Sequence, residues 1–277
     1  MEGRVIKKNA NIFTIDCGES VFDVMPSGKT KEKGIFVGDN VEFDDVITAV
    51  RERKNLLIRP PVANIDKMFI VVCEVPKADF LLVDKMIIYC YLNDIVPVIV
   101  INKIDIAKED FIKQIEEDYK FLDIVKISAK NQDVKELLPE IDGICALAGQ
   151  SAVGKSSIIN AIFASEVTQT GHLSKKIERG KQTTRMVTLY KTENGYIADT
   201  AGFSMLDLSM ISNLEKDELA SYYPDFMRAR EKCKYRSCLH EMGDCGIIEE
   251  VKSGKISQNR YKNYLKILNE LKVNKKY

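Results

Sequence analysis

Residues 149–157 read GQSAVGKSS, and this stretch decides the fold of the middle of the chain. It fits the pattern Gly-x-x-x-x-Gly-Lys-Ser/Thr and lies between an apolar run at 144–149 (ICALAG) and a run of helical character at 155–164 (KSSIINAIFA). A strand, a glycine-rich loop and a helix in this order cradle nucleotide phosphates, because backbone N–H groups and the helix N-terminus favour an anion. We therefore predict a phosphate-binding loop here.

The residues of this loop have different expected roles. Lys155 would reach the outer phosphates as a point charge, and Ser156 would place its hydroxyl on a magnesium ion. The other predicted nucleotide contacts of the loop are Gly149, Gln150, Ser151, Ala152, Val153, Gly154 and Ser157.

A second motif, ADTAG at 198–202, ends a predicted strand (GYIADT, 195–200) downstream of the loop. Asp199 would hold magnesium through water, and the backbone N–H of Gly202 would meet the terminal phosphate. Taken alone, these residues fit an ordinary turn equally well. The phosphate loop upstream favours the magnesium interpretation.

A third motif, NKID at 102–105, directly follows the apolar run IVPVIVI. Asp105 can accept two hydrogen bonds from the ring and exocyclic nitrogens of guanine, which adenine cannot supply. Asn102 can brace the base and the phosphate loop, and Lys103 belongs to the same motif. The motif predicts selection of guanine.

A fourth motif, SAK at 128–130, also follows a predicted strand. The Ala129 N–H would face the guanine carbonyl, with Ser128 and Lys130 on either side. The four motifs run in the order NKID, SAK, phosphate loop, DTAG, which is a cyclic shift of the usual GTPase order. Loops at the carboxyl ends of parallel strands meet at one edge of a sheet wherever each strand falls in the chain, so the shift leaves the site intact.

The surrounding pattern predicts an α/β fold of several domains. From residue 66 onward, buried strands alternate with helices, which is typical of a mostly parallel sheet with helices on both faces. Residues 1 to about 60 instead show short alternating runs broken by Gly, Asn and Asp, which favour a small antiparallel barrel or sandwich. After residue 203 the pattern is helical and irregular.

Three thiols and an imidazole gather at CKYRSCLHEMGDC, as Cys233, Cys238, His240 and Cys245. This grouping in a reducing compartment favours a closed structural zinc site over disulfides. The tail at 252–277 is rich in lysine and includes Tyr261 and Tyr264, so it either grips RNA or packs its apolar side on the zinc module.

Bulk composition excludes little. The chain of 277 residues has 41 Lys and Arg against 41 Asp and Glu, and 45% of its residues are hydrophobic. No basic and apolar leader and no apolar run of about 20 residues is visible, so we expect a cytoplasmic protein without membrane contact.

Together the four motifs, RPPVANID, RGKQTTR, the cysteine cluster and ISQNRYKNY resemble the circularly permuted GTPases of the RsgA (YjeQ) family over nearly the whole chain. The resemblance implies an OB-fold RNA-binding domain at 1–62, a permuted GTPase domain at 63–212 and a helical zinc-binding domain at 213–277. It also implies a monomer that hydrolyses GTP with the help of magnesium. This GTPase would act during late maturation of the small ribosomal subunit and would bind the rRNA of that subunit.

The polar loop between Ser165 and Arg185 would order around the nucleotide. By resemblance, Thr183 or Thr184 would meet magnesium, and Gln182 stands where many relatives have a histidine. We expect Gln182 to position the attacking water. Since Phe203 stands where many GTPases have a water-orienting glutamine, hydrolysis should be slow until a partner completes the site.

Two other functions are compatible with parts of the sequence. One is a passive zinc and OB-fold RNA-binding module with a vestigial nucleotide site. The other is a P-loop ATPase or nucleoside kinase. Both leave NKID and SAK as coincidences.

Overall fold

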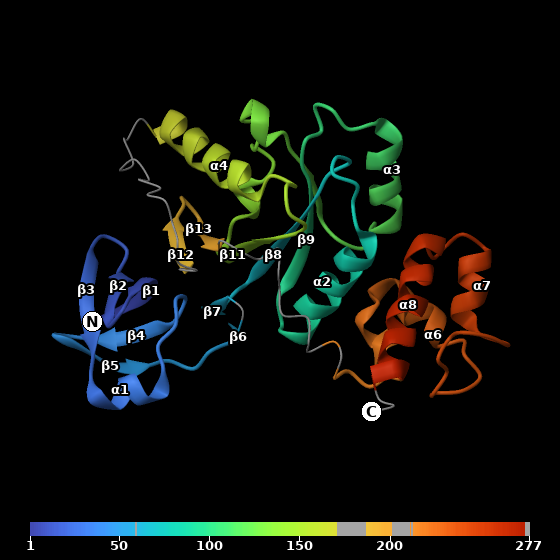
Figure 1. The fold of residues 1–277 in the computed structure, drawn as a ribbon, viewed down its shortest axis with the longest axis horizontal. Helices are drawn as coiled ribbons and strands as arrows, with labels where there is room; N and C mark the ends of the chain where they lie inside the picture. The colour runs from blue at the N-terminus through green and yellow to red at the C-terminus, as the bar shows by residue number, and fades with distance from the viewer. Residues whose placement is uncertain (59, 171–186, 201–210, 212, 275–277) are drawn as a thin grey trace.

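The computed structural model describes residues 1–58, 60–170, 187–200, 211 and 213–274. A small barrel, a sheet covered by helices and a helical module follow one another along the chain (Figure 1). In the described part of the chain, no helix combines the length and apolar character needed to cross a membrane.

The N-terminal barrel forms from five short strands and one helix. They are β1 (Glu2–Asn9), β2 (Ile12–Asp16), β3 (Val21–Pro26), α1 (Gly28–Lys33), β4 (Asn40–Phe43) and β5 (Val46–Val50). Strand β1 pairs with both β2 and β4, which closes the barrel. The inward residues of the alternating runs, including Val5, Ile15 and Ile47, fill its core.

The central sheet has the strand order β10-β9-β8-β11-β13-β12. Its strands are β8 (Lys67–Val72), β9 (Val96–Ile101), β10 (Ile124–Lys126), β11 (Gly143–Ala148), β12 (Val187–Lys191) and β13 (Gly195–Thr200). All neighbouring strands run parallel except the β12 and β13 pair. Because β8, β9 and β11 are buried on both faces, their sequences are almost continuously apolar.

Helices cover both faces of this sheet, as predicted. Helices α2 (Phe80–Leu92) and α3 (Glu109–Asp118) pack on the face that presents Met68, Ile70 and Ile99. Helix α4 (Lys155–Thr170), the short 3-10 helix η1 (Ala129–Asn131) and the segment around η2 (Leu138–Glu140) pack on the other face.

The barrel and the sheet join edge to edge. Strand β1 pairs with β12 at Lys7 and Thr188, so one hydrogen-bonded sheet runs through both parts. The Tyr196 hydroxyl on β13 donates to Asp16 at 2.9 Å, and Lys191 forms an ion pair with the same carboxylate. The hairpin of β6 (Leu56–Ile58) and β7 (Pro61–Ala63) connects the barrel to β8.

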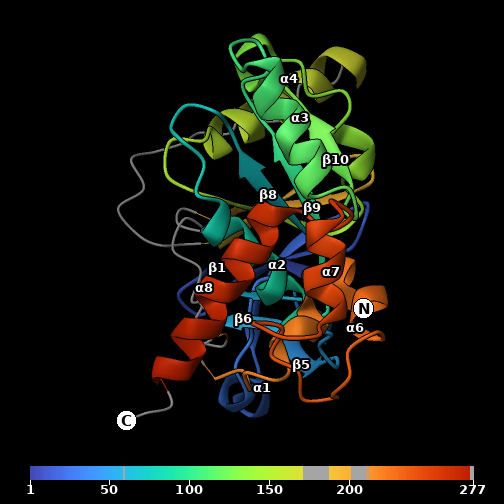
Figure 2. The ribbon, with the colours of Figure 1, turned by 90° about the vertical axis from the view of Figure 1, so that its right-hand side faces the viewer.

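The C-terminal module consists of short helices and one long helix. They are η4 (Leu219–Tyr222), η5 (Pro224–Phe226), α6 (Met227–Arg230), α7 (Gly246–Lys252) and α8 (Gln258–Asn274). Helix α8 packs against α2 (Figure 2), so the module rests on the helical layer of the central sheet.

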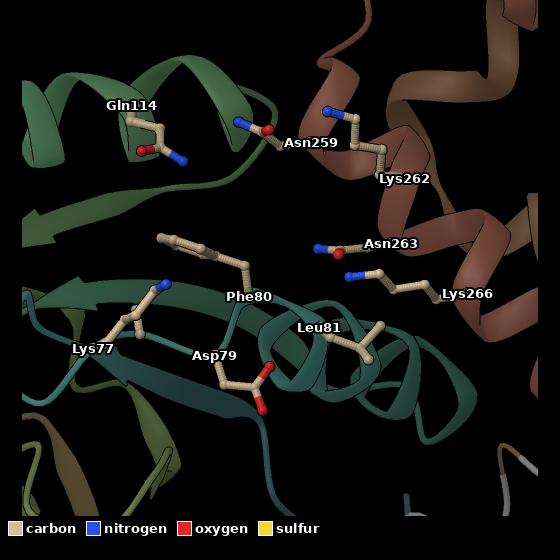
Figure 3. A pocket seen from close by; sticks show the side chains of 10 residues that line it. Lys77, Asp79, Phe80, Leu81, Gln114, Asn259, Lys262, Asn263 and Lys266 are labelled. Atoms are coloured by element: carbon tan, nitrogen blue, oxygen red, sulfur yellow. The ribbon is translucent and has the colours of Figure 1, made fainter.

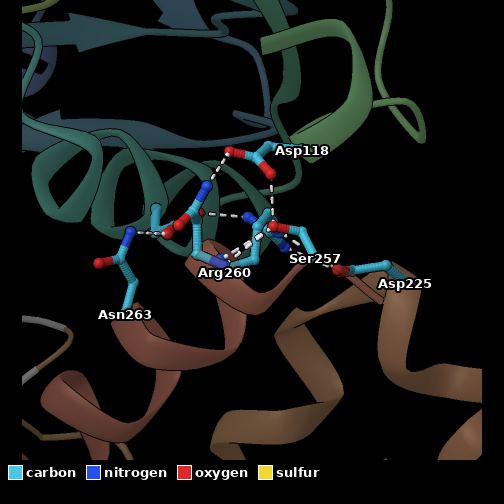
Figure 4. A network of polar contacts seen from close by, with 7 residues as sticks. Asp118, Asp225, Ser257, Arg260 and Asn263 are labelled. Atoms are coloured by element: carbon cyan, nitrogen blue, oxygen red, sulfur yellow. Dashed lines mark hydrogen bonds and ion pairs between the residues drawn. The ribbon is translucent and has the colours of Figure 1, made fainter. Parts of the chain in front are cut away.

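A buried ionic network joins the module to the central sheet (Figure 4). The Arg260 side chain on α8 is 1% exposed and forms ion pairs with Asp84 of α2 and with Asp225. The Asn263 amide also donates to Asp84, at 2.7 Å. Aromatic rings surround the guanidinium, with the Phe121 ring centre 4.4 Å away. A charge this deeply buried requires its partners, so the network fixes how α8 sits on α2.

Candidate nucleotide-binding site and metal cluster

The predicted motifs lie at one edge of the central sheet. NKID follows β9, SAK follows β10, the phosphate loop follows β11, and Asp199 lies near the end of β13. These strands run parallel and are neighbours in the sheet, with only β8 inserted between β9 and β11. The loops that follow them therefore all lie at the same edge of the sheet.

The phosphate loop depends on glycine at two positions. Gly149 has a φ of +138°, and a Cβ there would lie 2.4 Å from the Val71 carbonyl oxygen. Gly154 has a φ of +101°, and a Cβ there would lie 2.4 Å from the Asn102 amide nitrogen. A larger residue at either position would therefore strain the backbone, and at position 154 it would push the loop away from the NKID motif.

The Asn102 side chain ties three motifs together. Its amide nitrogen donates to the Val153 carbonyl at 2.8 Å, and its carbonyl oxygen accepts from the Ala129 N–H at 3.1 Å. The side chain is 2% exposed, so both hydrogen bonds are shielded from water. This residue holds the phosphate loop and the SAK segment at a fixed separation.

The other two polar residues of NKID also reach neighbouring motifs. The Ser128 hydroxyl donates to Asp105 at 2.6 Å, which orients the carboxylate. The Lys103 ammonium donates to the carbonyls of Ala152 at 2.9 Å and Val75 at 2.8 Å. The residues predicted to select the base and those predicted to cradle the phosphates therefore share one continuous contact network.

Lys155 begins α4 and lies within the phosphate loop. Its ammonium donates to the carbonyls of Gly149 and Gln150, each at 2.7 Å. Burial lowers its pKa. A phosphate group beside this ammonium would offset that burial, because an opposite charge favours the charged form.

The remaining predicted residues fall into two groups. The side chains of Ser156 and Ser157 are exposed at the start of α4, Ser151 and Ala152 are exposed in the loop, and Lys130 is exposed in η1. The candidates Gln182, Thr183, Thr184 and Gly202 lie outside the described residues, as does Phe203.

The structure adds one contact that the motifs do not indicate. The backbone N–H of Asp79, which caps the N-terminus of α2, donates to the Gln150 side-chain oxygen at 2.9 Å. Together with the bond between Lys103 and Val75, it attaches the loop at 75–79 to the site. No sequence pattern marks such a backbone partner.

The geometry of the cysteine cluster fits a tetrahedral metal ion. The ligand atoms of Cys233, Cys238, His240 and Cys245 all lie within 4.8 Å of one another. The Sγ atoms of Cys233 and Cys245 are 3.8 Å apart, and each lies 3.4 Å from the His240 Nδ1. Zinc bonds of about 2.3 Å to sulfur and about 2.1 Å to nitrogen give tetrahedral edges of about 3.8 Å between two sulfurs and about 3.6 Å between sulfur and nitrogen.

The surroundings of this cluster are also suited to a metal. Burial lowers the pKa of His240 to about 4, so the imidazole is neutral, as a ligand must be. The Tyr261 and Tyr264 hydroxyls donate to the His240 and Leu239 carbonyls, at 2.7 and 3.1 Å. Of the two predictions for the tail, the tyrosines therefore support packing on the module, and Tyr264 is buried.

Comparison with known proteins agrees with this geometry. Residues 50–209 match the family described as RsgA GTPase. The chain belongs to the RsgA GTPase family. It is therefore a GTPase, and the predicted alternatives of an ATPase, a kinase or a passive module are not supported.

Curated members of the RsgA GTPase family resemble the chain along its whole length. Small ribosomal subunit biogenesis GTPase RsgA 2 of Oceanobacillus iheyensis is 38% identical, over 99% of this chain and 98% of that protein. Small ribosomal subunit biogenesis GTPase RsgA of Staphylococcus haemolyticus is 36% identical, over 97% of both.

Solved structures of the family confirm the predicted fold class. YjeQ from Thermotoga maritima superposes with a TM-score of 0.82 at 34% identity, covering 98% of both chains. YloQ, described as a circularly permuted GTPase, superposes with a TM-score of 0.80 at 30% identity, covering 98% of this chain and 94% of YloQ. The shifted motif order is thus a property of a known fold.

Proposed function

We propose that this GTPase acts on the small ribosomal subunit during its late maturation, and that the subunit stimulates its slow intrinsic hydrolysis. The relatives named above are small ribosomal subunit biogenesis GTPases. The observation that carries the site assignment is the buried Asn102 side chain, which bonds the phosphate loop on one side and SAK on the other. A single nucleotide can span the two.

On the base side, Asp105 would accept the guanine ring N–H and exocyclic amine. Its bond from Ser128 holds the carboxylate in place, and the Ala129 N–H would donate to the guanine carbonyl. Asn102 keeps this pocket at the right distance from the phosphates, and Lys103 and Lys130 complete it.

On the phosphate side, the loop from Gly149 to Ser157 would wrap the α- and β-phosphates with its N–H groups. Lys155 would exchange its two carbonyl partners for phosphate oxygens. Hydroxyl and carboxylate oxygens from Ser156 and Asp199 are donors that Mg²⁺ prefers, and Thr183 or Thr184 would complete the set. When bound, Mg²⁺ neutralises charge on the phosphate oxygens.

Hydrolysis requires a water whose oxygen attacks the γ-phosphorus while the bond to the β–γ bridging oxygen breaks, giving GDP and phosphate. We propose that Gln182 hydrogen-bonds this water, and that Gly202 donates its N–H to the γ-phosphate. Phe203 cannot orient water, so the ribosomal partner supplies the remaining alignment.

The N-terminal barrel and the C-terminal module would contribute the contacts with rRNA. We propose an RNA-binding OB-fold at 1–62, a GTPase domain at 63–212 and a domain at 213–277 whose Cys233, Cys238, His240 and Cys245 hold one structural zinc ion. The donor distances given above support zinc. We infer a monomer that works in the cytoplasm and contacts rRNA.

The experiment is the GTP hydrolysis rate measured against increasing concentrations of purified small ribosomal subunits. We expect a slow basal rate that rises to saturation, and a flat response would refute the proposed partner. The Asp105→Asn variant tests the base pocket in the same assay. It should lose GTP turnover and gain turnover of xanthosine triphosphate, whose carbonyl replaces the guanine amine and accepts from the new amide. Unchanged GTP turnover would refute the role of Asp105.

A further inference from the structure

A groove of about 470 Å³ lies between the N-terminus of α2 and one face of α8 (Figure 3). It lies at the junction of the GTPase sheet and the C-terminal module. Four of its residues lie on α8 at helical spacing, so they form one stripe. The lining residues used below are Lys77, Phe80, Gln114, Asn259, Lys262, Asn263 and Lys266.

The rim of the groove carries unpaired positive charge. Lys77, Lys262 and Lys266 are exposed, and no carboxylate pairs with them among the described residues. Other lysines near α8 are paired, as in Lys85 with Glu270 at 2.6 Å. The one carboxylate in the lining, Asp79, already caps α2 by accepting from the Leu82 N–H. The groove therefore favours an anion.

The inner wall offers an aromatic ring and hydrogen-bond acceptors. Phe80 is half-buried and stacks on Tyr119, with 6.2 Å between ring centres. The Asn259 amide nitrogen donates to Asp118 at 3.1 Å, and the Asn263 amide nitrogen donates to Asp84. Their carbonyl oxygens have no donor among the described residues, so they remain available to N–H groups of a ligand. A plain phosphate chain has no such groups, whereas nucleobases do.

The groove is also attached to the nucleotide site. Lys77 lies in the loop at 75–79, whose Val75 carbonyl accepts from Lys103 and whose Asp79 N–H donates to Gln150. A ligand held by Lys77 would therefore touch a loop that is bonded to both the base-selecting motif and the phosphate loop.

We propose that this groove binds an unpaired segment of RNA, with phosphates at the three lysines and a base against Phe80. An unpaired strand is required because only an unstacked base can enter a pocket of this kind. The inference rests on the proposed function, since it assigns part of the contact with the small ribosomal subunit to this surface. It also offers a route by which bound RNA reaches the loop beside the nucleotide.

The test compares the triple variant Lys77→Gln, Lys262→Gln, Lys266→Gln with a matched control. The control is Lys120→Gln, Lys126→Gln, Lys135→Gln, which removes the same charge from exposed lysines of the GTPase sheet outside the groove. Binding to a labelled single-stranded RNA oligonucleotide is measured over a range of salt concentrations. Each lost phosphate contact lowers the slope of log affinity against log salt by about 0.7, so the groove variant should lose about 2.

Subunit-stimulated GTP hydrolysis should also fall in the groove variant, while basal hydrolysis matches that of the control variant. An oligonucleotide slope equal to that of the control would overturn the groove assignment. So would inorganic polyphosphate binding with the same affinity and lysine dependence, because the pocket would then not read RNA. If small subunits do not stimulate the wild-type protein, the proposed function fails. The salt slope measured with the oligonucleotide still tests whether the groove binds RNA.

Discussion

Replacing Arg260 by methionine should detach the C-terminal module from the GTPase sheet. The change leaves Asp84, whose side chain is 0% exposed, and Asp225, which is 10% exposed, without their shared cation. Removing one partner from a buried ion pair costs about 3–5 kcal/mol, because a desolvated charge is left uncompensated. Total stabilities of domains are about 5–15 kcal/mol, so the loss is large.

The loss should depend on pH. Burial raises the pKa of Asp84 to about 6 from 3.8, against the opposing effect of Arg260. The folded state thus binds a proton more readily than the unfolded state, so the contribution of Asp84 to the free energy of unfolding falls as pH rises through that range. Without Arg260 the pKa rises further and the fall is larger. The variant should therefore lose less stability at about pH 5 than at about pH 8.

Hydrogen exchange of the α8 backbone amides measures this local opening directly. The control is Lys266→Met, which makes the same kind of change at an exposed, unpaired position on the same helix and should cost less than about 0.5 kcal/mol. Adding Asp84→Asn to Arg260→Met should restore about 1–3 kcal/mol of the free energy of unfolding, because the double variant no longer buries the unpaired Asp84 carboxylate. If α8 in Arg260→Met exchanges like the control at both pH values, the network does not hold the module.

Two further predictions concern the nucleotide loop and the metal. Gly154→Ala should weaken GTP binding at least about tenfold in a titration with labelled nucleotide, because the added Cβ would collide with Asn102. The control is Gly18→Ala, at a similar φ of +93° but in open space, which should bind GTP with normal affinity. Equal affinities of the two variants would contradict the packing argument. Metal analysis should find one zinc ion per chain. A chelator or the Cys245→Ser substitution should lower the melting temperature of the C-terminal module, whereas the control Cys17→Ser should retain zinc. A melting temperature that does not respond to chelation would refute a structural role for zinc.

Much of the geometry of the candidate site could be predicted because it depends on residues that are close together in the chain. A strand, a glycine-rich turn and a helix are encoded by adjacent residues, so the phosphate loop and the start of α4 at Lys155 follow from the sequence. The motifs after β9 and β10 could be predicted for the same reason. What brings Asn102 to Val153, 51 positions away, is the parallel sheet, and that pairing could be inferred only from the rule for strand ends.

The features that sequence reasoning missed depend on partners far away in the chain. Arg260 lies in the lysine-rich tail at 252–277, but it is buried, and its partner Asp84 is 176 positions earlier. Helical periodicity shows that a charge falls on the same face as apolar residues, but it does not show which carboxylate meets it. The edge pairing of β1 with β12 could not be predicted either, because the sequence does not show which strand edges meet.

The placement of α2 gives the permuted order a mechanical consequence. In chain order, the strand that precedes α2, β8, is the first strand of the central sheet, and α2 lies between the nucleotide site and the C-terminal module. Its N-cap, Asp79, is bonded to Gln150 of the phosphate loop, and its buried Asp84 is bonded to Arg260 of α8. One rigid helix therefore touches the phosphate loop at one end and the module along its side. A shift of the phosphate loop would have to move the N-terminus of α2 or break the bond to Gln150. This connection would couple RNA bound in the groove and nucleotide bound at the site to the same helix.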